Sequence, residues 1–184
     1  MVLRTATRAI GVTGHCPSAL VAAVRAEVRR GLDWHQTSQN VASVLRSRPP
    51  SPASLLPPDL RRGDPACYQS HLVHAEPDGS FSMAVMVWLP GQQTPIHDHV
   101  SWCVPAVLQG MEHEEVFAME GKGLRLVDRH VNPVGAVCAF TPPGDIHRVR
   151  NCGDDVAISM HIYGADISRL GNSVRREYTL PILS

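Results

Sequence analysis

The stretch GQQTPIHDHVSWCVPAVLQG, residues 91–110, places His97 and His99 two positions apart in a segment of strand character. Alternate side chains of a β-strand share one face, so both imidazoles can point toward one centre. A third histidine, His147, opens another strand-like segment after the turn-forming residues 142–144. Three neutral imidazoles suit a divalent metal such as iron(II) or zinc and leave coordination positions open for a substrate. We therefore expect these three histidines to be the metal ligands.

The spacing around the histidines resembles the two cupin motifs. Residues 91–110 match the first motif, with Cys103 where most cupins carry a metal-binding glutamate. The second motif is matched by Gly135, Pro142, Gly144, His147 and Asn151. With the later segment SMHIY at 159–163, the chain is similar to thiol dioxygenases of the cysteine dioxygenase type over about residues 68–164. The resemblance implies iron(II) as cofactor, and addition of both atoms of O2 to the sulfur of a small thiol to give a sulfinate.

The fold class implied by the resemblance is mainly β: a small jelly-roll (cupin) β-barrel with a short helical N-terminal part. We expect a single cupin domain over 1–184, in which residues 1–48 form the helical part. Apolar residues at helical spacing predict helices over 18–30 and 36–46. The segment 48–65 is rich in proline, so it cannot be a continuous helix or a central strand.

Residues 67–164 are expected to form the β-barrel core. Short β-rich runs separated by turns predict about nine strands there. One is the segment around His97 and His99. The other expected strands are 68–76, 81–90, 104–110, 112–119, 124–131, 136–142, 147–151 and 156–164.

Composition favours a small-molecule partner. Seventeen basic and 17 acidic side chains give a formal net charge of +0, so the composition shows no excess of basic residues that would favour binding to nucleic acid or an anionic membrane. No segment approaches the roughly 18 apolar residues of a membrane span, and the first residues lack a signal-peptide pattern. Five cysteines at irregular spacing fit reduced intracellular thiols. We expect a cytoplasmic monomer or small homo-oligomer that acts on a thiol and O2.

Polar residues alternate along the segment that contains Ser159, His161 and Tyr163, so they share a face of the expected strand. An amphipathic strand with polar residues outward would give the same pattern. The resemblance implies instead a catalytic relay, in which the tyrosine hydroxyl reaches the substrate or oxygen, the histidine holds it and the serine orients the histidine. In some members of the family a cysteine at the place of Cys103 is joined to this tyrosine, which implies a Cys103–Tyr163 thioether crosslink. The alternative is a small buried packing residue.

Substrate recognition departs from the animal-type pattern. An arginine two residues after a tyrosine binds the substrate carboxylate in those enzymes, and Ser70 stands at that place. Relatives acting on 3-mercaptopropionate use an arginine downstream of the relay tyrosine. Arg169, Arg175 and Arg176 are the candidates for this role, unless they are solvated surface residues. Trp102, beside the first motif, is a further candidate for the pocket wall.

Several functions stay open at this point. Cys103 favours L-cysteine as the substrate, whereas Ser70 argues against the animal-type enzyme, and 3-mercaptopropionate is the alternative substrate. A cysteine-oxidising tailoring enzyme of secondary metabolism is a further form of the same chemistry. A non-catalytic metal-binding cupin would have no need for a relay, and non-oxidative cupin enzymes usually retain the glutamate that Cys103 replaces.

Overall fold

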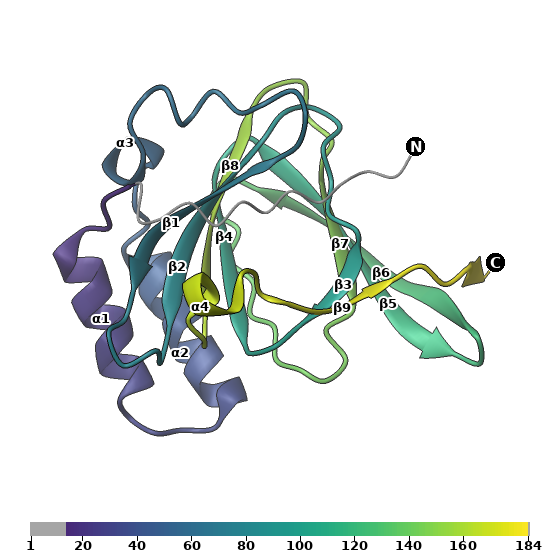
Figure 1. The fold of residues 1–184 in the computed structure, drawn as a ribbon, viewed down its shortest axis with the longest axis horizontal. Coiled ribbons are helices and arrows are strands. Elements are labelled where there is room, and N and C mark those ends of the chain that lie inside the picture. Colours follow the sequence, from purple (N-terminus) through teal and green to yellow (C-terminus); the bar gives the residue numbers. More distant parts are fainter. Residues whose placement is uncertain (1–13, 184) are drawn as a thin grey trace.

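Two β-sheets curl around a common interior, and helices cover the outer face of one of them (Figure 1). This computed structural model describes residues 14–183. The first sheet has the order β1 (Gln69–Ala75), β2 (Ser82–Trp88), β8 (Ala157–Tyr163) and β4 (Cys103–Gln109). The second has the order β10 (Ile182–Leu183), β6 (Gly123–Pro133), β5 (Met111–Glu120), β7 (His147–Asn151), β3 (Ile96–His99) and β9 (Val174–Tyr178). The fold is mainly β, as the sequence predicted.

The N-terminal helices lie close to their expected positions. The first, α1 (Ser18–Val28), ends two residues before the predicted boundary, and α2 (Trp34–Ser47) begins two residues earlier than predicted. The earlier start follows from an N-cap, because the Asp33 carboxylate accepts a hydrogen bond from the backbone N–H of Gln36 at 2.8 Å. Residues 1–13 of the expected helical part lie outside the described residues. No helix in the described part is long and apolar enough to span a membrane.

Two short helices interrupt the connecting segments. The proline-rich segment contains α3 (Pro52–Leu55), where Ser51 caps the first turn and proline occupies a position that needs no N–H donor. After β8 the chain forms α4 (Ile167–Leu170), with Asp166 as its cap.

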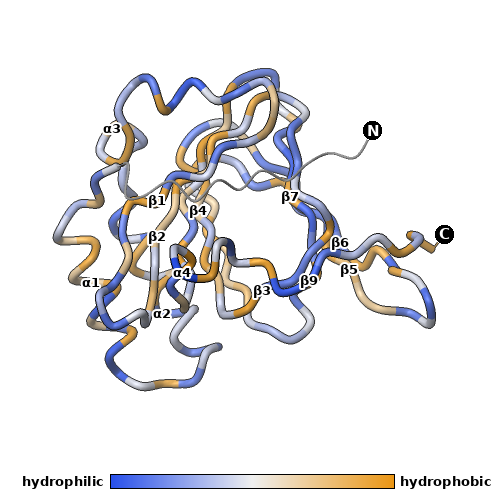
Figure 2. Tube along the Cα trace, in the orientation of Figure 1, coloured by the Kyte–Doolittle hydropathy of each residue, from blue (hydrophilic) through white to orange (hydrophobic). Residues whose placement is uncertain are grey.

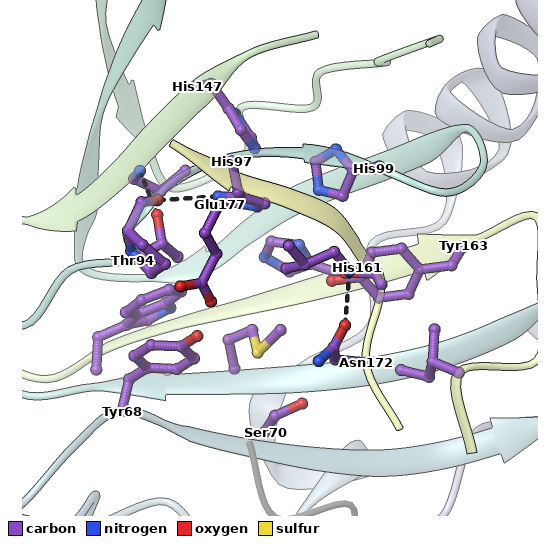
Figure 3. A pocket seen from close by; sticks show the side chains of 17 residues that line it. Tyr68, Ser70, Thr94, His97, His99, His147, His161, Tyr163, Asn172 and Glu177 are labelled. Carbon is purple, nitrogen blue, oxygen red and sulfur yellow. Dashed lines mark hydrogen bonds between the residues drawn. The ribbon is translucent and has the colours of Figure 1, made fainter. Parts of the chain in front are cut away.

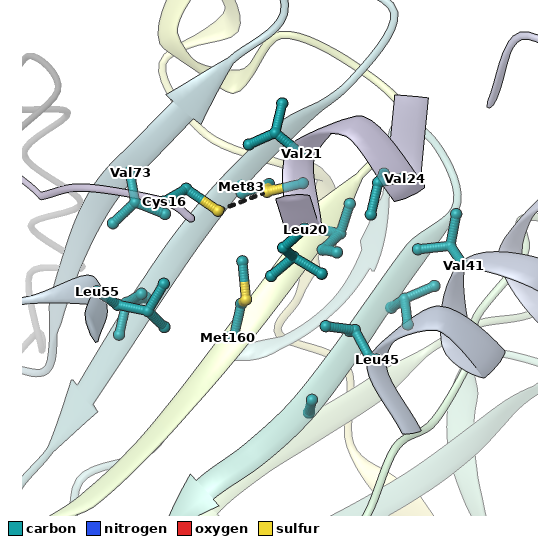
Figure 4. Close-up of a cluster of buried hydrophobic side chains, with 14 of the residues drawn as sticks. Cys16, Leu20, Val21, Val24, Val41, Leu45, Leu55, Val73, Met83 and Met160 are labelled. Carbon is teal, nitrogen blue, oxygen red and sulfur yellow. Dashed lines mark hydrogen bonds between the residues drawn. The ribbon is translucent and has the colours of Figure 1, made fainter. Parts of the chain in front are cut away.

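The main hydrophobic core lies between α1, α2 and the first sheet (Figure 4). Leu20 and Val24 of α1 and Leu45 of α2 pack there with Met83 and Met160 from the sheet. Burying each such side chain contributes about 1.5–3 kcal/mol. Figure 2 shows apolar residues concentrated where these helices face the sheet, while β9 is largely hydrophilic.

Strand β8 is central to the first sheet, and all seven of its residues are buried. Ile158, Met160 and Ile162 belong to the core under the helices. The intervening residues therefore face the opposite way, into the space between the sheets. This alternation brings the polar residues of the SMHIY segment to the barrel interior.

The structure differs from the sequence prediction in residues 136–142 and in the part of the chain after β8. Residues 136–142 were expected to form a strand, but their backbone hydrogen bonds to β4 give isolated bridges, Cys103 with Phe140 and Ala106 with Val137, and no continuous strand. Pro105 lies between these bridges in β4 and has no N–H with which to continue the ladder. The strand β9 was not predicted, and it pairs with β3 beside the histidines.

Candidate metal centre

The three motif histidines lie together on the inner face of the second sheet. His97 on β3 and His147 on β7 are direct cross-strand partners, and His99 follows two positions later on β3. Their ring centroids are 4.7–5.0 Å apart, and one ligating nitrogen from each lies within 4.8 Å of the others. All three side chains are buried. The alternation argument thus selected residues that do converge on one point.

Each of these histidines has its Nδ1 atom engaged by an acceptor, which fixes the orientation of the ring. An Nδ1–H that donates to an acceptor leaves the Nε2 lone pair free to bind a metal. The acceptors are the Pro95 carbonyl oxygen for His97 at 3.0 Å, the Asp145 carboxylate for His99 at 2.9 Å, and the Glu114 carboxylate for His147 at 2.6 Å. Two of the three rings therefore have the carboxylate–histidine arrangement that commonly supports metal ligands.

The donor set fits a divalent transition metal. Burial lowers the pKa of His97 well below its usual value, and burial also lowers the pKa of His147, to about 3, so both rings are neutral near pH 7. The Nε2 atom of His147 is buried and has no hydrogen-bond partner among the described residues. A buried polar atom without a partner is costly, and a metal ion would satisfy it.

Of the contacts expected in the relay, the structure shows the one between Ser159 and His161. The Ser159 hydroxyl lies 3.0 Å from His161 Nε2, and the Trp88 indole N–H donates to the same hydroxyl at 3.2 Å. His161 Nδ1 faces the Cys103 sulfur at 4.0 Å. Within residues 14–183 no hydrogen bond joins His161 to Tyr163, whose ring centroids are 6.0 Å apart. The structure therefore places His161 between the serine and the cysteine.

Cys103 and Tyr163 lie directly opposite each other on the paired strands β4 and β8. Both side chains are almost fully buried, and they share a small apolar cluster with Leu72 and Ile167. Burial raises the pKa of both groups well above their usual values, so the thiol and the phenol are protonated. The pairing brings together the two side chains that the predicted crosslink requires.

A pocket of about 80 Å³ opens beside the histidines (Figure 3). His161 and Tyr163 line it together with the three candidate ligands. The apolar part of the wall comes from Met86, Trp88, Pro95, Val149, Ile167 and Val174. The remaining polar wall residues are Tyr68, Ser70, Thr94, Asn172, Ser173 and Glu177. Ser70 thus lies in the pocket, at the place of the arginine in the animal-type enzymes.

Comparison with known families identifies the chain. The family described as cysteine dioxygenase type I matches residues 59–172. The chain belongs to the cysteine dioxygenase type I family. Membership, together with the three-histidine cluster, points to a dioxygenase of the cupin fold that is able to hold a metal. Membership of the family does not specify which thiol is the substrate.

Solved structures with similarity to the chain include several cupins. A cupin 2 conserved barrel domain protein from Salinispora arenicola is 18% identical, with a TM-score of 0.43 and coverage of 55% of this chain and 78% of that chain. The cupin domain of Cnp3 from Schizosaccharomyces pombe is 15% identical, with a TM-score of 0.43 and coverage of 56% and 65%. A recombinant oxalate oxidase in complex with glycolate is 21% identical, with a TM-score of 0.40, and the match spans 47% of this chain and 42% of the oxidase.

The three arginines proposed as carboxylate anchors do not line the pocket of this cysteine dioxygenase family member. Arg169 forms an ion pair with Asp166, and Arg175 forms one with Asp98. The guanidinium of Arg176 lies 5.7 Å from the Tyr178 ring centroid. Asp98 and Arg176 are cross-strand partners, so their side chains share the face opposite that of His97. Arg175 and Arg176 therefore serve the face of the second sheet that is opposite the histidines, and Arg169 pairs with the cap residue of its own helix α4.

Trp102 also lies away from the pocket. It is buried in the hydrophobic core, where Gly164 gives it room. A Cβ atom added at Gly164 would lie 2.1 Å from the Trp102 indole nitrogen. Trp102 therefore packs against this end of β8, and the prediction that it forms part of the pocket wall is wrong.

Sequence reasoning missed four acidic residues around the site. Glu112 and Glu114 alternate on the buried face of β5, and such a pair of inward carboxylates in a strand was an available signal. Asp145 precedes His147 by two residues, also within the motif. Glu112 lies near Ser159 and Trp88, and burial raises its pKa to about 7. Glu177 lies beyond the family match and on the unpredicted strand, so no motif pointed to it.

Proposed function

We propose that the protein is a mononuclear non-haem iron(II) thiol dioxygenase that oxidises the sulfur of a small thiol with O2 to a sulfinate. The observation that carries the proposal is the cluster of three buried histidines with their Nδ1 atoms occupied, beside a pocket in a member of the cysteine dioxygenase type I family. His97, His99 and His147 would hold the metal through Nε2. Iron(II) bound there supplies open positions for a thiolate and O2 side by side, which zinc cannot use for O2 activation.

The protein's part in this chemistry is to bind, orient and exclude water. Three neutral ligands leave the divalent charge uncompensated, which favours an anionic thiolate in the pocket. The apolar wall residues Met86 and Val149 limit the access of water to the sulfur. Since burial raises the pKa of Tyr163, its hydroxyl remains protonated and can donate a hydrogen bond to substrate or oxygen.

The crosslink belongs to the same proposal. Joining the Cys103 sulfur to a ring carbon of Tyr163 removes one S–H and one C–H hydrogen, and O2 is the oxidant that accepts them. The direct pairing of the two residues on β4 and β8 supports this step. His161 at 4.0 Å from the sulfur is placed to orient the cysteine.

L-Cysteine, the substrate favoured from the sequence, carries both a thiol and an amine. Within residues 14–183, the pocket lining includes no arginine that could bind a carboxylate. The alternative substrate is 3-mercaptopropionate, which has a carboxylate and no amine. Oxygen-electrode assays of iron-loaded protein against L-cysteine, 3-mercaptopropionate, cysteamine and mercaptosuccinate, with mass analysis of the products, test the proposal. We expect O2 uptake and a product heavier by two oxygen atoms with at least one thiol.

The control for these assays is His147→Ala, which should lose both iron and O2 uptake. Iron-loaded wild-type protein that consumes no O2 with any of the four thiols would contradict the proposal and favour a non-catalytic metal-binding cupin. Full iron occupancy in His147→Ala would remove that residue from the ligand set.

A further inference from the structure

Glu177 occupies a defined place beside the metal-binding histidines. The register of the second sheet makes His97 the direct partner of His147 on one side and of Glu177 on the other. Side chains in such a cross-strand row point to the same face, with neighbouring Cβ atoms about 4.5–5.5 Å apart. Figure 3 shows the Glu177 side chain extending into the pocket below His97.

Glu177 also sets the charge of the pocket. Among the described residues that line it, Glu177 is the one carboxylic acid, and the lining includes no lysine or arginine. None of the ion pairs within residues 14–183 involves Glu177. The neighbouring arginines, Arg175 and Arg176, are directed to the buried residues Asp98 and Tyr178 on the opposite face of the sheet. The carboxylate is therefore available to a ligand.

We propose that Glu177 binds the ammonium group of the substrate, so that the pocket selects primary aminothiols over thiols that carry only a carboxylate. This inference rests on the proposed thiol oxidation and names its substrate class. An aminothiol would then form two favourable charge pairs, one at each end of the molecule. Its thiolate would lie at the metal ion held by the histidines, and its ammonium group would lie at the Glu177 carboxylate. A carboxylate at the second end would meet Glu177 with like charge, which acts against thiols such as 3-mercaptopropionate.

The neutral residues of the same wall agree with this assignment. Ser70 stands where the animal-type enzymes carry the carboxylate-binding arginine, and Asn172 and Ser173 lie just before β9. These side chains add hydrogen-bonding groups without positive charge. The pocket volume of about 80 Å³ also matches a small ligand. L-Cysteine remains a proposed substrate because it has an amine that can pair with Glu177.

Binding measured without turnover is the direct test. Iron-loaded protein is titrated anaerobically with cysteamine, L-cysteine methyl ester, L-cysteine and 3-mercaptopropionate, and KM values are measured in parallel under air. Wild-type protein should bind cysteamine and the methyl ester more tightly than 3-mercaptopropionate. Glu177→Gln should raise Kd and KM for the two amines by about two- to fivefold, as expected for one charged contact at an exposed residue, and leave 3-mercaptopropionate unchanged or improved.

Glu177→Arg should reverse the order of preference, because the new charge attracts a carboxylate and repels an ammonium. Glu120→Gln is the matched control, since Glu120 is an exposed residue that pairs with Arg125 on the far hairpin. Equal effects of Glu177→Gln on amine and carboxylate thiols would overturn the inference, and so would no effect on either. Loss of iron from Glu177→Gln would make the residue a metal ligand and also overturn it.

The same experiment separates this inference from the proposed function. Absence of O2 uptake with every thiol would refute the dioxygenase proposal while the anaerobic binding order still decides the role of Glu177. O2 uptake that is fastest with 3-mercaptopropionate and unchanged by Glu177→Gln would support the proposed dioxygenase activity and refute the proposed selection of aminothiols by Glu177.

Discussion

Replacing Glu114 should weaken metal binding although the residue does not face the metal position. Its carboxylate lies 2.6 Å from His147 Nδ1, and both side chains are almost fully buried. Losing such an outer partner typically lowers metal affinity about 10- to 100-fold, or about 1.4–2.8 kcal/mol. Glu114→Gln keeps an acceptor oxygen but loses the charge, so we expect a loss of about tenfold. Glu114→Ala leaves the buried Nδ1–H unpaired, so we expect about a hundredfold.

The measurement is a competition between the protein and a chelator of known affinity, with iron(II) under argon and with zinc in a parallel series. Glu115→Gln is a control from the adjacent position of β5, where the carboxylate pairs with Arg148 and Arg129 on the outer face. It should bind metal as wild-type protein does. Unchanged affinity in both Glu114 variants, with their fold intact, would refute the view that this contact supports the ligand.

Three further outcomes are expected. Tyr163→Phe should retain iron and thiol binding while turnover falls about ten- to ten-thousandfold, and an unchanged rate would show that the hydroxyl has only a structural role. Protein turned over under air should contain a growing fraction two hydrogens lighter, which is absent from Cys103→Gly; only uncrosslinked protein after many turnovers would contradict the thioether. Glu76, whose pKa the Arg25 guanidinium lowers, stabilises the fold as a carboxylate and loses this effect as the pH falls through its lowered pKa. Urea unfolding of Glu76→Gln should therefore show destabilisation at pH 7 that shrinks in acid, and a deficit constant with pH would argue against the ion pair.

The three candidate metal ligands could be predicted because their geometry is local. His97 and His99 lie on one strand, where a spacing of two fixes a common face, and the second motif supplied His147. The same reasoning placed Ser159, His161 and Tyr163 on the inner face of β8. Period-two alternation and motif spacing thus predicted the centre of the site, and the resemblance of the two motifs to those of cupins implied the fold class.

The wall of the pocket could not be predicted in the same way, because it depends on which strands become neighbours. Arg175 and Arg176 were plausible anchors by sequence position, yet the pairing of β9 with β3 turns them toward Asp98 and Tyr178. The same pairing places Glu177, an exposed residue, in the lining of the pocket, although nothing in the local sequence distinguishes it from other surface residues. Glu114 reaches His147 only because β5 and β7 are paired.

Strand β9 forms one edge of the second sheet, with β3 as its single neighbour there. The histidines lie on β3 and β7, one and two strands further in. Substitutions on an edge strand disturb fewer neighbours than those on a central one, so changes at Glu177 and the residues before it should leave the strands that carry the histidines in place. A lineage of such proteins could thus acquire a new thiol by changes confined to this short segment, and directed libraries for altered selectivity should begin with residues 172–177.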